Sequence, residues 1–168
     1  MRYRLDVVAA SVADVVRFAG GWMYDRVMAG WDVTVLLAGG ADERPLQIPG
    51  VDTADLESAL ALWADRPHPQ TVAVAADLFA SDERVRRGVL GALEQGLTEV
   101  TLWGETWPTE LDDSVGPVEH HLSAAARAFK SQALTAAAAD GDSVQPTETF
   151  RCGVMATPAV PSDLVPAS

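Results

Sequence analysis

Cysteine and lysine are almost absent from this sequence of 168 residues, which contains only Cys152 and Lys130. A single cysteine excludes an intramolecular disulfide and any zinc site built from several cysteines. We therefore expect a protein of a reducing compartment and assign it to the cytoplasm. The other eleven basic residues are all arginine, a usage typical of GC-rich bacterial genomes.

Long hydrophobic runs are also missing. The first six residues lack the apolar core of a signal peptide, and no later run reaches the roughly 18 apolar residues of a membrane helix. We expect neither secretion nor a membrane span.

Positive charge is scarce, with 12 basic against 24 acidic side chains and a formal net charge of −12. Such a field repels phosphate backbones, so nucleic acid is not expected as a partner. Hydrophobic residues make up 48% of the chain, which is typical of a folded globular protein. We expect one α/β domain over 1–140, followed by an irregular, proline-rich tail over 141–168 with one possible short strand at 150–155.

The order of apolar and polar residues predicts an alternation of strands and helices. Strands are expected at 3–10, 31–38, 71–76 and 98–103, the last as a half-exposed edge because polar and apolar residues alternate in it. Helices are expected to begin at Ser11, at Asp52 or Thr53, at Ser81 and near Pro117. Together they predict a mostly parallel sheet of four to five strands in the order 2-1-3-4, covered by helices on both faces in a three-layer, Rossmann-like sandwich.

Gly20 and Gly21 interrupt the first predicted helix, where two glycines cost about 2 kcal/mol relative to alanine. We interpret them as a kink or as a place of close approach, with packing against the sheet as the expected cause. The segment 20–37, above all the run Gly30-Trp31-Asp32-Val33-Thr34-Val35-Leu36, resembles the first helix and second strand of many nucleotide-sugar glycosyltransferases. This pattern is common to βαβ units, so no activity is carried over from it.

The sequence lacks the common motifs that indicate a catalytic site. It has no phosphate-binding G-x-x-x-x-G-K-[ST] loop, no G-x-G-x-x-G turn after the first strand and no G-x-S-x-G elbow. His120 and His121 are adjacent on a predicted helix and point about 100° apart, so they do not form a chelating pair. Cys152 falls in the predicted tail. We therefore expect no catalytic residue, no metal site and no cofactor.

Residues at the carboxyl ends of the predicted strands are the candidates for binding a small ligand, because open α/β sheets bind ligands at that edge. Ser11 caps a helix, and the pair Gly39 and Gly40 ends a strand, so each also has an ordinary structural explanation. Asp77 and Glu105 follow two later strands and would be the acidic groups of such a site.

The segment 104–116 is acidic and rich in turn residues, and we expect it to be a mobile surface loop. Large aromatic side chains beside it could anchor a protein partner. The candidate partner-binding residues are Trp103, Trp107, Glu110, Asp112 and Asp113.

The leading interpretation is a non-catalytic module that binds a protein partner or regulates one, because a complete fold pattern occurs without a catalytic constellation. The first alternative is a ligand-binding protein or enzyme that uses the carboxyl ends of the strands. The second is a structural protein that associates with itself.

Overall fold

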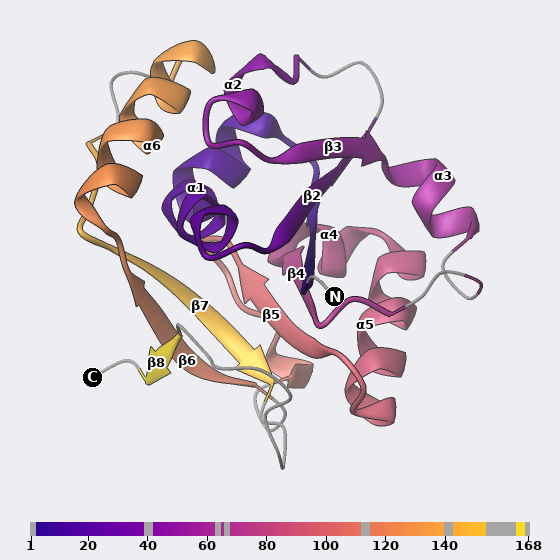
Figure 1. Ribbon diagram of the computed structural model, residues 1–168. Coiled ribbons are helices and arrows are strands. Elements are labelled where there is room, and N and C mark those ends of the chain that lie inside the picture. The colour runs from indigo at the N-terminus through magenta and orange to yellow at the C-terminus, as the bar shows by residue number, and fades with distance from the viewer. Residues whose placement is uncertain are drawn as a thin grey trace.

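The protein forms a single mixed sheet flanked by helices (Figure 1), and its computed structural model describes residues 3–38, 42–62, 65, 68–111, 115–139, 143–153 and 164–166. Eight strands lie in the order β3-β2-β1-β4-β5-β7-β6-β8. Their bounds are β1 Arg4–Ala9, β2 Asp32–Leu37, β3 Asp52–Asp55, β4 Thr71–Ala75, β5 Glu99–Trp103, β6 Val115–His121, β7 Thr147–Gly153 and β8 Val165–Pro166.

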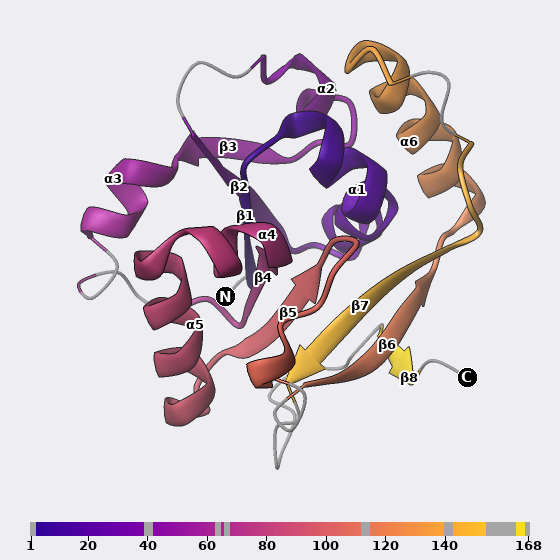
Figure 2. The same cartoon turned by 180° about the vertical axis from the view of Figure 1, so that it is seen from behind.

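The helices form a layer on each side of this sheet, as the two opposite views show (Figure 2). They are α1 Val12–Met28, α2 Arg44–Gln47, α3 Leu56–Ala61, α4 Ala76–Ser81, α5 Glu83–Gln95 and α6 Ala124–Ala136, with a short 3₁₀ helix at Thr109–Leu111. One core cluster joins α1, α2 and α6 to the sheet, and the second joins α3, α4 and α5 to it. The predicted three-layer α/β fold is confirmed.

The parallel half of the sheet has the predicted strand order. Strands β2, β1, β4 and β5 are neighbours in that order and all run parallel, which is the 2-1-3-4 arrangement. Strand β3 adds a further parallel strand beside β2. Strand β3 occupies the residues where the second helix was predicted to begin. That helix, α3, begins later and is capped by Asp55, whose Oδ2 accepts a hydrogen bond from the Ser58 amide at 2.9 Å.

The antiparallel half differs from the prediction. Strand β5 is not a half-exposed edge: all five of its residues are buried, and β7 pairs with its free side. Strand β7 occupies Thr147–Gly153 of the segment expected to be irregular after 140, and it includes the predicted strand position 150–155 as far as Gly153. The helix predicted from Pro117 is wrong over its first turns, because that residue lies in β6, which pairs with β7; α6 begins only at Ala124.

Local capping explains where the helices of the parallel half begin and end. Ser11 caps α1, as predicted, with its Oγ accepting from the Asp14 amide at 3.3 Å. Ser81 does not cap the third predicted helix: it ends α4, and Asp82 caps α5. Gly96 closes α5 with a φ of 67°, the left-handed conformation that glycine adopts without penalty.

Gly21 marks a place of close approach inside α1. A Cβ built on it would lie 2.1 Å from Cδ2 of Leu122, a distance that no real pair of carbons tolerates. The predicted close contact is therefore present, but it is made by Leu122, between β6 and α6, and not by the sheet.

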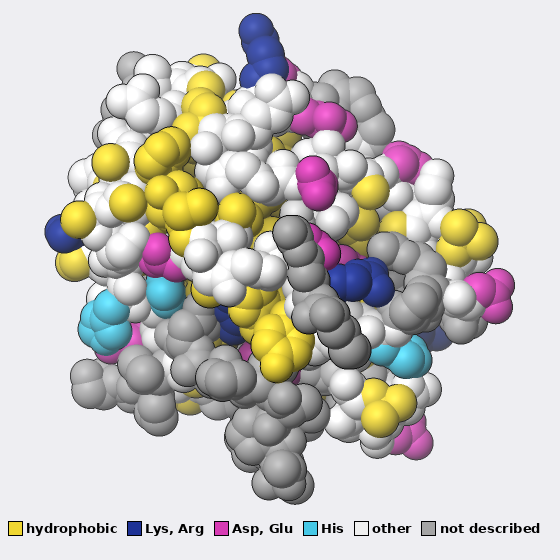
Figure 3. Space-filling model, in the orientation of Figure 1, with side chains coloured by type: hydrophobic (Ala, Val, Ile, Leu, Met, Phe, Trp, Pro, Cys, Tyr) yellow, Lys and Arg dark blue, Asp and Glu magenta, His cyan; other side chains and the backbone are white. Residues whose placement is uncertain are grey.

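The described part of the chain contains no helix that is both long and apolar enough to span a membrane. Hydrophobic side chains show on one face of the molecule over α6 and α2 (Figure 3). Phe129, a residue of α6, is 40% exposed.

Candidate functional site

A hollow of about 240 Å³ lies at the carboxyl ends of β1, β4 and β5. We call it the acidic hollow because three of its lining side chains are carboxylates. Its lining residues are Asp14, Phe18, Asp77, Trp103, Gly104, Glu105 and Thr106.

Each carboxylate reaches the acidic hollow from the segment that directly follows a parallel strand. Asp14 lies in the first turn of α1, after β1. Asp77 lies in the first turn of α4, after β4. Glu105 follows β5 across Gly104, whose φ of 136° is a conformation that side-chain-bearing residues rarely adopt. The parallel strands therefore bring three acidic residues that are far apart in sequence to one edge of the sheet.

The charge of the acidic hollow is only partly neutralised. Asp14 Oδ1 accepts from Arg17 at 2.7 Å, and Asp77 Oδ1 accepts from the backbone amide of Leu78 at 2.8 Å. Glu105 is exposed and has no hydrogen-bond or ion-pair partner among the residues that the structure describes. Among the described residues, no lysine, arginine or histidine lines the hollow.

Two aromatic side chains complete the wall. The rings of Phe18 and Trp103 lie 6.0 Å apart, centroid to centroid. Trp103 is only 2% exposed, and its indole Nε1–H finds no hydrogen-bond acceptor in the described part of the chain. Leaving such a buried donor unpaired costs about 1–3 kcal/mol.

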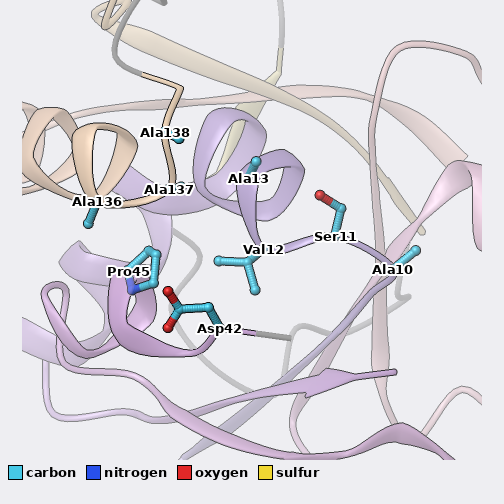
Figure 4. Close-up of a pocket in the computed structure, with 9 residues that line it drawn as sticks. All are labelled: Ala10, Ser11, Val12, Ala13, Asp42, Pro45, Ala136, Ala137 and Ala138. Atoms are coloured by element: carbon cyan, nitrogen blue, oxygen red, sulfur yellow. The ribbon is translucent and has the colours of Figure 1, made fainter. Parts of the chain in front are cut away.

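A second hollow, of about 390 Å³, lies beside the N-terminus of α1 (Figure 4). Small apolar side chains dominate its wall, so we call it the alanine hollow. It is lined by Ala10, Ser11, Val12, Ala13, Asp42, Pro45, Ala136, Ala137 and Ala138.

The structure brings some of the predicted ligand-binding residues together and separates others. Asp77 and Glu105 share the acidic hollow, whereas Ser11 lines the alanine hollow. Gly39 and Gly40 lie outside the described residues. Sequence reasoning missed Phe18 and Asp14, although the position of Asp14 in the first helical turn after β1 placed it at the same edge of the sheet.

Three of the predicted partner-binding residues lie in the described part of the chain, and of these three only Glu110 is exposed. Trp103 is buried, and Trp107 is half-buried, with the Arg151 guanidinium 5.3 Å from its ring centroid. Glu110 pairs with Arg86 at 2.8 Å, and Asp112 and Asp113 lie outside the described residues. The 3₁₀ helix at Thr109–Leu111 gives part of the predicted loop a regular structure.

Cys152 and His120 both lie in strands of the sheet. Cys152 lies in β7, and burial raises the pKa of its thiol to about 12, which makes it a poor nucleophile at neutral pH. His120 contacts Asp25 at 2.7 Å, on the far half of α1. No group of three or more His, Cys, Asp or Glu side chains among the described residues could hold a metal ion.

Comparison with known proteins gives a likeness of fold. No protein-family model and no curated protein sequence matches the chain. Among solved structures, the A40926 pseudoaglycone deacetylase Dbv21 is similar with a TM-score of 0.64 and 15% identity, over 94% of this chain and 99% of that one. The zinc-inhibited form of teicoplanin deacetylase Orf2 is similar with a TM-score of 0.62 and 12% identity, over 89% and 97%.

A third similar structure is the conserved protein TT1542 from Thermus thermophilus, with a TM-score of 0.54 and 17% identity, over 96% of this chain and 98% of that one. At these identities the likeness establishes the α/β fold.

These comparisons correct the leading interpretation of the sequence. The expected non-catalytic module, and with it the expectation that the chain is not an enzyme, is contradicted because the similar structures include several deacetylases. The first alternative, a ligand-binding protein or enzyme that uses the carboxyl ends of the strands, fits better. The sequence contains no contiguous catalytic motif, whereas the residues that line the acidic hollow come from three separate segments of the chain.

Proposed function

We propose that this protein is an enzyme that hydrolyses an acyl amide, with the acidic hollow as its active site. The observation that carries the proposal is the convergence of Asp14, Asp77 and Glu105 at the carboxyl ends of three parallel strands. This edge is where α/β sheets bind their ligands. The fold shared with deacetylases supports amide hydrolysis as the reaction class.

Carboxylates can supply both proton transfers that amide hydrolysis needs. A water oxygen adds to the acyl carbon while a base takes a water proton; the C–N bond then breaks as the nitrogen receives a proton, giving an amine and a carboxylic acid. Glu105 is assigned the base, because it is exposed and has no partner among the described residues. Asp77 is assigned the second proton transfer, from the adjoining strand end.

Asp14 is assigned a positioning role. Its pairing with Arg17 and the capping of its amide by Ser11 hold its carboxylate in place. It can accept a hydrogen bond from a substrate hydroxyl or amide without exchanging a proton.

A metal ion is not part of the proposed mechanism. One similar deacetylase structure is a zinc-inhibited form, but the His, Cys, Asp and Glu side chains in the described part of this chain form no group that could hold such an ion. The described residues therefore do not fit a metal site, and no step of the mechanism uses one.

The proposal is tested by measuring acetate released from N-acetylglucosamine and from 4-nitroacetanilide. We expect release by the wild-type chain, and a loss of roughly 100-fold or more in the Glu105→Gln variant, which removes the general base. Asp77→Asn should lower kcat in the same way.

The matched control is Glu94→Gln. Glu94 is an exposed residue near the end of α5, next to the start of β5 and so at the opposite edge of the sheet. Its substitution should leave acetate release unchanged. Equal rates in Glu105→Gln and Glu94→Gln, or no release by the wild type, would contradict the proposal.

A further inference from the structure

The outer face of α6 carries no carboxylate. Residues 120–139 contain no Asp or Glu, and no other stretch of the sequence without them is as long. Arg127 is the only charged residue among the exposed residues of α6, and it points about 100° away from its neighbour Ala128. We define the outer face by six exposed residues of the helix, Ala124, Ala125, Ala128, Phe129, Gln132 and Ala136.

This face differs from that of the other long helix on the surface. The opposite side of α6 is buried, through Ala126, Ala133 and Leu134 among others. A surface helix normally turns charged side chains outward, as α5 does with Glu83 and Arg87. Helix α6 instead is largely apolar on its outer side as well, and Figure 3 shows hydrophobic side chains gathered over it.

Phe129 gives the outer face an ordered aromatic side chain. Its ring stacks on that of buried Tyr24, with centroids 4.7 Å apart and planes 18° from parallel, while 40% of the residue stays exposed. A partner that covers Phe129 therefore gains apolar burial without having to order this side chain first. Ala125 and Ala128 lie beside it and are small enough to let a second helix approach closely.

The charge of the whole chain indicates which molecule covers this face. With a formal net charge of −12, the chain attracts a basic partner toward its carboxylates, which the outer face lacks. An acidic partner is repelled wherever carboxylates are present, so it approaches best where none faces it. A second copy of this chain is such an acidic molecule, and it presents the same uncharged face in return.

We infer that two copies of the chain associate through the outer faces of their α6 helices, across a two-fold axis near Ala128. In this arrangement Phe129 of each copy packs against the alanines of the other. The contact is one pair of helices, each about 20 Å long. Such a contact is at the low end of interface sizes, so the dimer is weak, with a dissociation constant on the order of 100 µM.

Sedimentation equilibrium of the full chain, at concentrations that bracket this dissociation constant, tests the inference. We expect the mean mass to rise from the 17.8 kDa of one chain toward twice that value. Association should be stronger at about 500 mM salt than at about 20 mM, because salt screens the repulsion between two acidic copies. A mass of one chain at every concentration would mean that another partner or none covers the face, and it would overturn the inference. Association that weakens with salt would indicate an ion-paired interface elsewhere and would overturn it too.

Two alanine variants locate the interface. Ala128→Glu brings two carboxylates together near the axis and should weaken association roughly tenfold or more. The matched control is Ala61→Glu, which makes the same change at an exposed position of α3, a helix of the other core cluster. It should leave association nearly unchanged. Equal weakening in the two variants would contradict the assignment to α6.

A mixture of two variants separates loss of the interface from loss of the fold. Ala128→Glu and Ala128→Lys should each sediment as a single chain, because like charges meet at the axis. Mixed together they should form a one-to-one dimer, because opposite charges then meet. Recovery in the mixture shows that both variants are folded and that their outer faces meet near Ala128. A mixture that stays monomeric would overturn the inference.

Discussion

Lys130 and Glu148 form a buried ion pair, with Nζ 2.7 Å from Oε2, that also contacts the backbone of helix α1. Lys130 Nζ donates to the Arg17 carbonyl at 2.6 Å, and Glu148 accepts from the Gly21 amide at 2.9 Å. Glu148 also accepts from the Trp22 amide at 2.7 Å. The pair thus ties α1 to α6 and β7.

Removing one member of this pair should strongly destabilise the fold. In Glu148→Ala the ammonium of Lys130 stays buried without its counter-ion, and the amides of Gly21 and Trp22 lose their acceptor. Breaking a buried pair in this way costs about 3–5 kcal/mol. Urea unfolding followed by tryptophan fluorescence measures the loss, with Glu94→Ala as the exposed control. A loss below that of the control would show that the pair adds nothing to stability.

Two glycines in helices should respond to alanine in opposite directions. Gly21→Ala places a methyl group on Leu122 and should destabilise the protein by about 1–3 kcal/mol. Gly91, inside α5, has no atom within 4 Å of a Cβ built on it, so Gly91→Ala should stabilise by about 0.5–1 kcal/mol. Thermal unfolding of both variants checks the signs; the same sign for both would refute this explanation.

Cys152 should resist alkylation while the protein is folded. Its thiol pKa is raised from 9.0 to about 12, chiefly by burial, so the thiolate fraction at pH 8 falls roughly 1,000-fold relative to the unfolded chain. Mass spectrometry after iodoacetamide treatment, with and without concentrated guanidinium, measures the rate ratio. Rapid labelling of the folded protein would contradict the burial of this thiol.

Metal removal should leave the proposed activity unchanged. The reason is that no described group of His, Cys, Asp or Glu side chains could hold a metal ion. Acetate release is measured before and after dialysis against EDTA. Loss of release on dialysis, with recovery on addition of zinc, would contradict a mechanism based on carboxylates alone.

The parallel half of the fold could be predicted from sequence because its signals are local. Ser11 sits between an apolar run and a helical stripe, and Gly96 ends another helix, so the strand–helix alternation shows directly. A shared edge of the sheet then places Asp77 near Glu105 without any knowledge of their side chains. Crossovers between parallel strands are right-handed and the connections here are short, so few other orders of the four strands were possible.

The antiparallel half could not be predicted because its strands acquire their structure from pairing. Glu99 and Thr101 alternate with apolar residues, which is the pattern of an edge strand. However, β7, which is distant in sequence, pairs with β5. Pro117 and the histidines after it give no strand signal of their own, and pairing with β7 overrides their local preference. Association with a protein partner or with a second copy remains a prediction.

The location of the ligand site is the central claim, and amide chemical-shift mapping tests it most directly. N-acetylglucosamine is titrated into ¹⁵N-labelled protein while backbone amides and tryptophan indoles are followed. We predict that the shifts concentrate on Gly104, Thr106 and the Trp103 indole, and leave Gly91 and Glu94 unmoved. Shifts centred on another part of the molecule, or no shifts at millimolar ligand, would contradict the assignment of the acidic hollow as the functional site.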